Sequence, residues 1–115
     1  MVVLAAEFTA AQLTLGLDIM DMEPFVNHKM SKRVRKVKSI LITGSAAVDD
    51  FKCDLYYGQR LQASNLYNVS TGLANITQKT IPIVGGDMCH QDEPIKLVIT
   101  DAADTNPVYI KLCIS

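Results

Sequence analysis

The sequence predicts an all-β protein, a single β-sandwich of about seven or eight antiparallel strands in a jelly-roll or Greek-key topology. Three observations support this class. Apolar and polar residues alternate over short runs, which is the pattern of strands that cover a core with one face. Turn signals recur at spacings of about 8–12 residues. Several connections are longer than a tight hairpin needs, which suits strands that cross between two sheets.

The composition fits one globular domain. The chain has 115 residues, of which 49% are hydrophobic and 20% are charged. This length supports a single core, and the hydrophobic content argues against a disordered chain. We expect residues 1–11 to form an N-terminal arm or edge segment and residues 12–115 to form the sandwich domain. We find no internal repeat, no signal peptide and no apolar run of membrane-spanning length.

The first half of the chain predicts two strands. Residues 1–11 are ambiguous between helix and strand. Leucines alternate with other residues from Gln12 to Ile19, so we predict a strand there, although Gly16 lies inside it. Residues 20–31 form a connection, because Pro24 excludes a central strand. A long strand is expected from about Arg33 to Gly44.

The second half predicts five more strands. After a turn in SAAVDD, strands are expected in FKCDLYYG and LQASNLYNV, followed by a loop in STGLANITQK. A short strand around Ile76–Val84 precedes the polar loop GGDMCHQDEP. The end of the chain is predicted to be a β-hairpin joined by DAADTN, each of whose strands has an apolar face. These faces comprise Ile95, Leu97 and Ile99 in one strand and Val108, Ile110, Leu112 and Ile114 in the other.

A basic segment, residues 29–38, is the strongest feature that the fold does not explain. It holds six of the eleven basic residues and no acid, whereas the rest of the chain carries five basic and twelve acidic residues. Such segregation attracts phosphate, an anionic membrane or an acidic surface on another copy. The alternative is edge protection, because lysines on an edge strand block unwanted pairing. The candidate contact residues are Lys29, Lys32, Arg33, Arg35, Lys36 and Lys38.

The N-terminal segment MVVLAAEF is a second candidate contact. It is hydrophobic, and it is hard to bury in a sandwich whose strands are already assigned. An arm exchanged with a neighbouring copy, or a strand between subunits, would cover it. The alternative is that it packs on its own domain. The candidate arm residues are Val2, Val3, Leu4 and Phe8.

The sequence predicts no metal site, no cofactor and no catalytic residues. Asp87, Cys89 and His90 are close in sequence, but an adjacent cysteine and histidine rarely face one point, and His28 has no partner at ligand spacing. A solvated loop is the preferred interpretation. Serines lack a nucleophile-elbow setting, and no carboxylate pair lies in a defined cleft.

The three cysteines indicate a reducing compartment. Cys53, Cys89 and Cys113 are an odd number at wide spacing, unlike the dense, even set of a secreted scaffold. Cys53 is in phase with the apolar face of its strand and is expected to be buried. Cys113 is out of phase and should face the other side. One disulfide stays open as an alternative.

In overall pattern the chain resembles small single-jelly-roll or sandwich capsid proteins of icosahedral viruses. The resemblance is carried by ILITGSAAVDDFKCDLYYG, by the closing LVITDAADTNPVYIKLCI, and by the basic segment that precedes the first of these. It implies repeated copies that contact one another and other structural proteins, an arm that reaches a neighbour, and a basic face toward nucleic acid, membrane or adjacent subunits. It also implies location in a virion, with the cytoplasm as the alternative.

We therefore weigh three classes of function. The first is a structural assembly protein, a small virion component that self-associates and has no small-molecule substrate. The second is a non-catalytic β-sandwich binding module for carbohydrate or peptide. One of Tyr56 and Tyr57 must face outward and could stack on a sugar, but the chain has no tryptophan and few other aromatic residues. A small enzyme ranks last.

Overall fold

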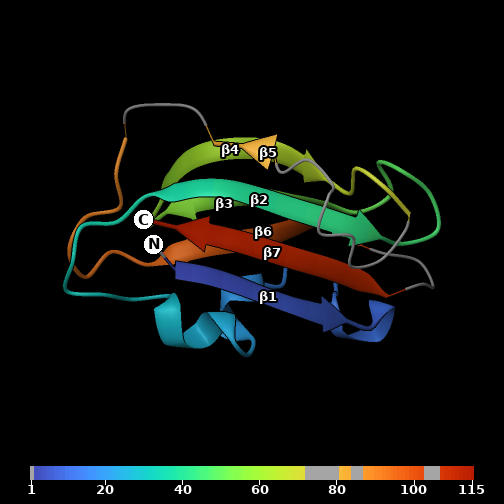
Figure 1. Cartoon of the computed structure of the whole chain (residues 1–115), viewed down its shortest axis with the longest axis horizontal. Helices are drawn as coiled ribbons and strands as arrows, with labels where there is room; N and C mark the ends of the chain where they lie inside the picture. Colours follow the sequence, from blue (N-terminus) through green and yellow to red (C-terminus); the bar gives the residue numbers. More distant parts are fainter. Residues whose placement is uncertain (1, 72–80, 84–86, 103–106) are drawn as a thin grey trace.

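The computed structural model of the chain describes residues 2–71, 81–83, 87–102 and 107–115. These residues form a β-sandwich of two antiparallel sheets (Figure 1), with strand orders β1-β7-β2-β5 and β4-β3-β6, which confirms the predicted fold class. The strands are β1 (Val2–Phe8), β2 (Val37–Gly44), β3 (Lys52–Tyr57), β4 (Arg60–Tyr67), β5 (Ile81–Pro82), β6 (Ile95–Asp101) and β7 (Val108–Ile114). Three short 3₁₀ helices are η1 (Ala10–Gln12), η2 (Ile19–Asp21) and η3 (Phe25–His28). No described helix is long and apolar enough to cross a membrane.

The core lies between the inward faces of the two sheets. Buried and half-buried residues alternate without interruption along β3 and β7, as the period-two pattern predicts. From β6, Leu97 is fully buried, and from β7 so are Ile110 and Leu112. Burying each such side chain stabilises the fold by about 1.5–3 kcal/mol. Cys53 is buried in this core, as predicted.

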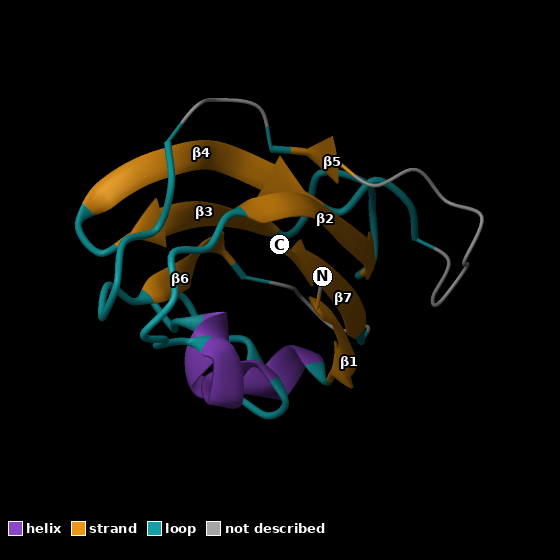
Figure 2. Ribbon diagram, turned by 60° about the vertical axis from the view of Figure 1, so that its left-hand side comes forward, coloured by secondary structure: helices purple, strands orange, loops and turns teal. Residues whose placement is uncertain are grey.

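The predicted terminal hairpin is wrong, although both of its strands exist. β6 pairs with β3 in one sheet, whereas β7 pairs with β1 and β2 in the other. The two strands therefore lie in opposing sheets of the sandwich (Figure 2). The physical reason is that the two apolar faces pack against each other across the core, which requires strands in opposing sheets. The chain also changes sheet between β2 and β3, between β4 and β5 and between β5 and β6.

The predicted strand from Gln12 to Ile19 is also wrong. Gly16 has a φ of +84°, which breaks an extended strand at its centre. Leu13 and Ile19 are buried, but Leu15 is 69% exposed, so the alternating residues do not share a face. Only Asp18 forms an isolated bridge, with Val98 of β6.

Residues 10–28 instead cover the side of the sandwich between β1 and β6 (Figure 2). Met20 and Phe25 are fully buried there. The ring of Phe25 lies 6.0 Å from that of Phe8 on β1, at an interplanar angle of 36°. Aromatic pairs at this separation attract each other beyond the area that they bury. The segment therefore completes the core rather than extending a sheet.

The other strands differ from the prediction mainly at their ends. The long strand begins at Val37 rather than near Arg33. β3 and β4 occupy the predicted runs FKCDLYYG and LQASNLYNV. Of the short strand expected around Ile76–Val84, the structure describes residues 81–83, where β5 pairs with Ser39 and Ile40. Most of the predicted loop STGLANITQK lies outside the described residues.

Candidate functional site: an edge strand and a basic segment

Three of the four sheet edges are blocked within the described residues. β4 has two register shifts against β3, and its Asn65 has a φ of +56°. At the edge of β6, the Ile99 amide donates to the Leu17 carbonyl at 2.9 Å, and the Gly16 amide donates to the Ile99 carbonyl at 2.9 Å. β5 is a two-residue strand that contains Pro82. Bulges, covering segments, short strands and proline are the usual means of preventing edge-to-edge association.

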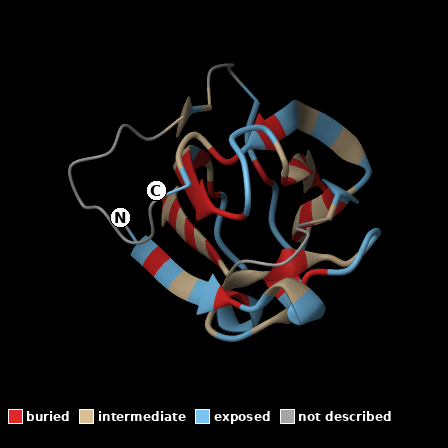
Figure 3. Cartoon of the chain, turned by 90° about the vertical axis from the view of Figure 1, so that its right-hand side faces the viewer, coloured by how far each residue is buried: buried red, intermediate tan, exposed pale blue. Residues whose placement is uncertain are grey.

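β1 is different, because its outer edge is regular and unblocked. All seven of its residues pair in unbroken register with β7, from Val2 opposite Ile114 to Phe8 opposite Val108. No described residue forms a hydrogen bond to its other edge. Figure 3 shows this strand, which begins near the N-terminus, along the outside of the molecule.

The predicted arm residues divide into two pairs. Leu4 and Phe8 point into the core and are only 8% and 4% exposed. Val2 and Val3 are 37% and 53% exposed. The segment thus packs on its own domain through one face and leaves two valines uncovered. The exposed residues of β1 include a single charged one, Glu7.

Two lysines of the basic segment form ion pairs within the chain. Lys29 contacts Asp18 at 2.9 Å and Asp21 at 2.5 Å. Burial acts to lower the pKa of Lys29, but the hydrogen bonds to Asp21 and Asp18 outweigh it and raise that pKa. Lys32 lies 3.3 Å from Asp92, with both side chains largely exposed, so this pair adds little stability.

Arg35 is turned into the protein. It is 7% exposed, and its guanidinium donates to the backbone carbonyls of His28, Lys29 and Glu93. Its backbone also exchanges two hydrogen bonds with Cys89. Of the six predicted contact residues, Arg35 therefore stabilises the fold and is not available at the surface.

Apart from Lys29 and Arg35, the basic residues of the segment stay at or near the surface. Lys32, Arg33 and Lys38 are exposed, whereas Lys36 is half-buried. Arg33 lines a hollow of about 260 Å³ together with the exposed apolar residues Val2, Met30 and Val34. The start of the arm and the basic segment, which are about 30 residues apart in sequence, thus meet at one end of the sandwich.

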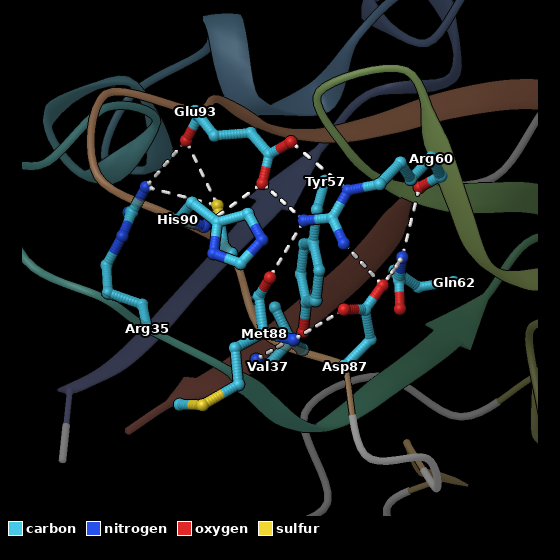
Figure 4. A network of polar contacts seen from close by, with 10 residues as sticks. Arg35, Val37, Tyr57, Arg60, Gln62, Asp87, Met88, His90 and Glu93 are labelled. Carbon is cyan, nitrogen blue, oxygen red and sulfur yellow. Dashed lines mark hydrogen bonds and ion pairs between the residues drawn. The ribbon is translucent and has the colours of Figure 1, made fainter.

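A separate cluster of polar residues surrounds Arg60 at the start of β4 (Figure 4). Arg60 binds both carboxylate oxygens of Glu93, at 2.5 and 3.2 Å, and a carboxylate oxygen of Asp87 at 2.6 Å. The Gln62 amide also donates to Asp87, at 3.1 Å. These contacts fasten the start of β4 to the segment before β6. This cluster could not be predicted from the sequence, since nothing near Arg60 in the sequence indicates its partners.

The residues that were candidates for metal or sugar binding do not form a common site in the described part of the chain. Cys89 is buried, while Asp87 and His90 are exposed. No group of three metal-ligating side chains occurs in the part of the chain that the structure describes. Tyr57 is buried and Tyr56 is half-buried on the opposite face, as the strand alternation predicts. All three cysteines are free.

Comparison with known proteins gives no relative for this chain. No family model matches it. No curated protein and no solved structure matches it either.

Proposed function

We propose that this protein is a structural protein that self-associates, and that it serves as a small capsid or capsid-associated component of a virion. One observation carries the proposal: β1 is a regular, largely apolar edge strand, while the described residues block the other three edges. An exposed edge of this kind is a ready template for pairing with another chain. A contact between copies would use it.

The exposed apolar residues near β1 support the same proposal. Val3 is 53% exposed, and Val2, Met30 and Val34 are exposed around one hollow. Large apolar side chains that gather on a surface commonly mark a protein contact. The location in a virion is the more specific part of the proposal. Its support is the resemblance of the sequence to small capsid proteins of icosahedral viruses. Lys32, Arg33 and Lys38 are exposed and could face nucleic acid, an anionic membrane or a neighbouring subunit.

The test is to measure the oligomeric state of the purified chain by sedimentation over a range of concentrations. Deleting residues 1–11 would not be a clean test, because Leu4 and Phe8 belong to the core. We use Val3→Glu instead, which places a charge on the outer face of β1. Leu61→Glu on β4 is the matched control, because Leu61 is equally exposed, at 53%.

We expect the wild-type chain and Leu61→Glu to form oligomers of the same size. Val3→Glu should remain folded and shift to the monomer, because a charged side chain on an edge strand opposes pairing. A wild-type chain that stays monomeric at every concentration would contradict the proposal and favour the binding module. Equal loss of association in both variants would show that β1 has no special part in it.

A further inference from the structure

We infer that the partner of β1 is β1 of a second copy, paired antiparallel across a two-fold axis at Ala5. This inference rests on the proposed self-association and specifies its contact. An isologous contact of this kind needs only one surface, which both copies present. The two four-stranded sheets would join into one continuous sheet, with the two β1 strands at its centre.

The direction of pairing follows from Glu7. A parallel, in-register pair would set Glu7 directly opposite the same residue of the second copy, and like charges in that position destabilise a sheet. An antiparallel pair separates the two carboxylates to opposite ends of the contact. Glu7 is exposed and has no ion-pair partner among the described residues.

The register follows from the faces of the strand. Leu4 and Phe8 face the core, whereas Val3 and Glu7 are exposed. Directly opposite residues in a sheet share a face, so a slip by one residue would set exposed positions against core positions. Among the registers that keep the faces matched, the one centred on Ala5 is the one that pairs all of Val2–Phe8. It places two small alanines on the axis and Glu7 of one copy opposite Val3 of the other.

This register also gives Glu7 a defined neighbour. Glu7 shares the outer face of β1 with Val3 and Ala5, whereas Leu4 and Phe8 share the inner face. Glu7 of the second copy therefore lies opposite the exposed Val3, and not opposite another carboxylate. By symmetry, the contact would contain two such Glu7–Val3 pairs.

The first test is cross-linking through cysteine. Cys113 is replaced by Ser, since Cys53 and Cys89 are buried, and Ala5→Cys is introduced. Residues directly opposite each other in antiparallel strands have Cα atoms about 4.5–5.5 Å apart, which suits a disulfide. Glu7→Cys is the control on the same strand, because in this register two such cysteines lie about 13 Å apart along the strand. We expect a covalent dimer from Ala5→Cys under mild oxidation and little from Glu7→Cys.

The second test is a charge exchange, measured by sedimentation. Val3→Glu sets a like charge opposite Glu7 twice in this register, so it should raise the dissociation constant of the dimer about tenfold. The double exchange, Val3→Glu with Glu7→Lys, makes both pairs attractive and should restore most of the affinity. Val3→Glu with Glu23→Lys is the control of equal net charge, and it should restore nothing because the exposed Glu23 lies outside β1.

The outcomes separate this inference from the proposal beneath it. If the wild-type chain associates but Ala5→Cys cross-links no better than Glu7→Cys, or if the double exchange restores nothing, the two-fold β1 contact is wrong and self-association still stands. If the wild-type chain is monomeric throughout, both are overturned. Preferential cross-linking of Ala5→Cys together with rescue by the double exchange supports the inference.

Discussion

The hydroxyl of Tyr57 accepts a hydrogen bond from the backbone amide of Val37 at 2.9 Å, and this bond joins the two sheets. Tyr57 ends β3 in one sheet, and Val37 begins β2 in the other. Both residues are buried, with exposures of 1% and 0%. Burial raises the pKa of the Tyr57 hydroxyl, and the bond from Val37 opposes part of this rise. The bond therefore satisfies a buried amide at the point where the basic segment becomes a strand.

We predict that Tyr57→Phe lowers the free energy of unfolding by about 1–3 kcal/mol, because it leaves the Val37 amide buried without a partner. Tyr56→Phe removes the same hydroxyl group from the half-buried residue next in the chain, and it should change stability by less than about 0.5 kcal/mol. Urea unfolding followed by circular dichroism measures both. Equal effects of the two variants would show that the bond between the sheets contributes nothing.

The side-chain hydrogen bonds of Asn68 lead to a further prediction, which concerns the turn between β2 and β3. Its side-chain oxygen accepts from the amides of Asp50 and Phe51, and its nitrogen donates to the carbonyls of Gly44 and Ala47. Asn68→Ala leaves these four groups without their partner, so we expect a loss of more than about 2 kcal/mol. The exposed Asn27→Ala should be nearly neutral in the same urea titration. A small effect of Asn68→Ala would mean that water replaces these bonds.

Periodicity could predict which face of a strand is buried. Tyr57 and Cys53 point inward, and the apolar residues of β6 and β7 are buried as expected. These positions depend on local alternation, which the sequence displays directly. Periodicity could not decide which sheet each strand joins. That choice depends on how two apolar faces meet across a core, and a hairpin and a crossed connection show the same alternation.

The polar contacts were the least predictable part of the molecule. In the sequence Arg35 is one basic residue among six, yet it is buried in the structure. Its partners are mostly backbone carbonyls, which no side-chain pattern reveals. Arg60 and Glu93 are 33 positions apart and meet only after the sheets have formed. The alternating pattern predicts a strand that includes Gly16, but the positive φ of this residue is incompatible with a regular strand. Such features follow from the tertiary structure, not from the local sequence.

The Arg60 cluster predicts a loss of stability in acid. The hydrogen bond from Arg60, followed by that from the His90 amide, lowers the pKa of Glu93. The hydrogen bonds from Gln62 and then Arg60 lower the pKa of Asp87. A carboxyl group whose pKa is lower in the folded state stabilises the fold above its unfolded pKa of about 4 and loses that contribution as the pH falls.

We therefore expect the free energy of unfolding to decrease from pH 7 to pH 3, and Glu93→Gln to make that decrease smaller. The exposed Glu23→Gln is the control and should leave the dependence on pH unchanged. Urea titrations at the two pH values measure the difference for each variant. An unchanged pH dependence in Glu93→Gln would contradict the assigned role of its ion pair with Arg60.

The three cysteines should react at different rates in the native protein. Cys53 is buried, and desolvation followed by the charge of Asp54 raises the pKa of its thiol. Burial also raises the pKa of Cys89, whose thiol donates to the Glu93 carbonyl at 3.0 Å. Because the thiolate is the reactive form, both should resist alkylation at pH 8, whereas the half-exposed Cys113 should react first. Mass spectrometry after iodoacetamide treatment identifies the modified residue, and urea should expose the other two. Cys113→Ser should therefore abolish rapid labelling, and rapid native labelling of Cys53 would contradict its place in the core.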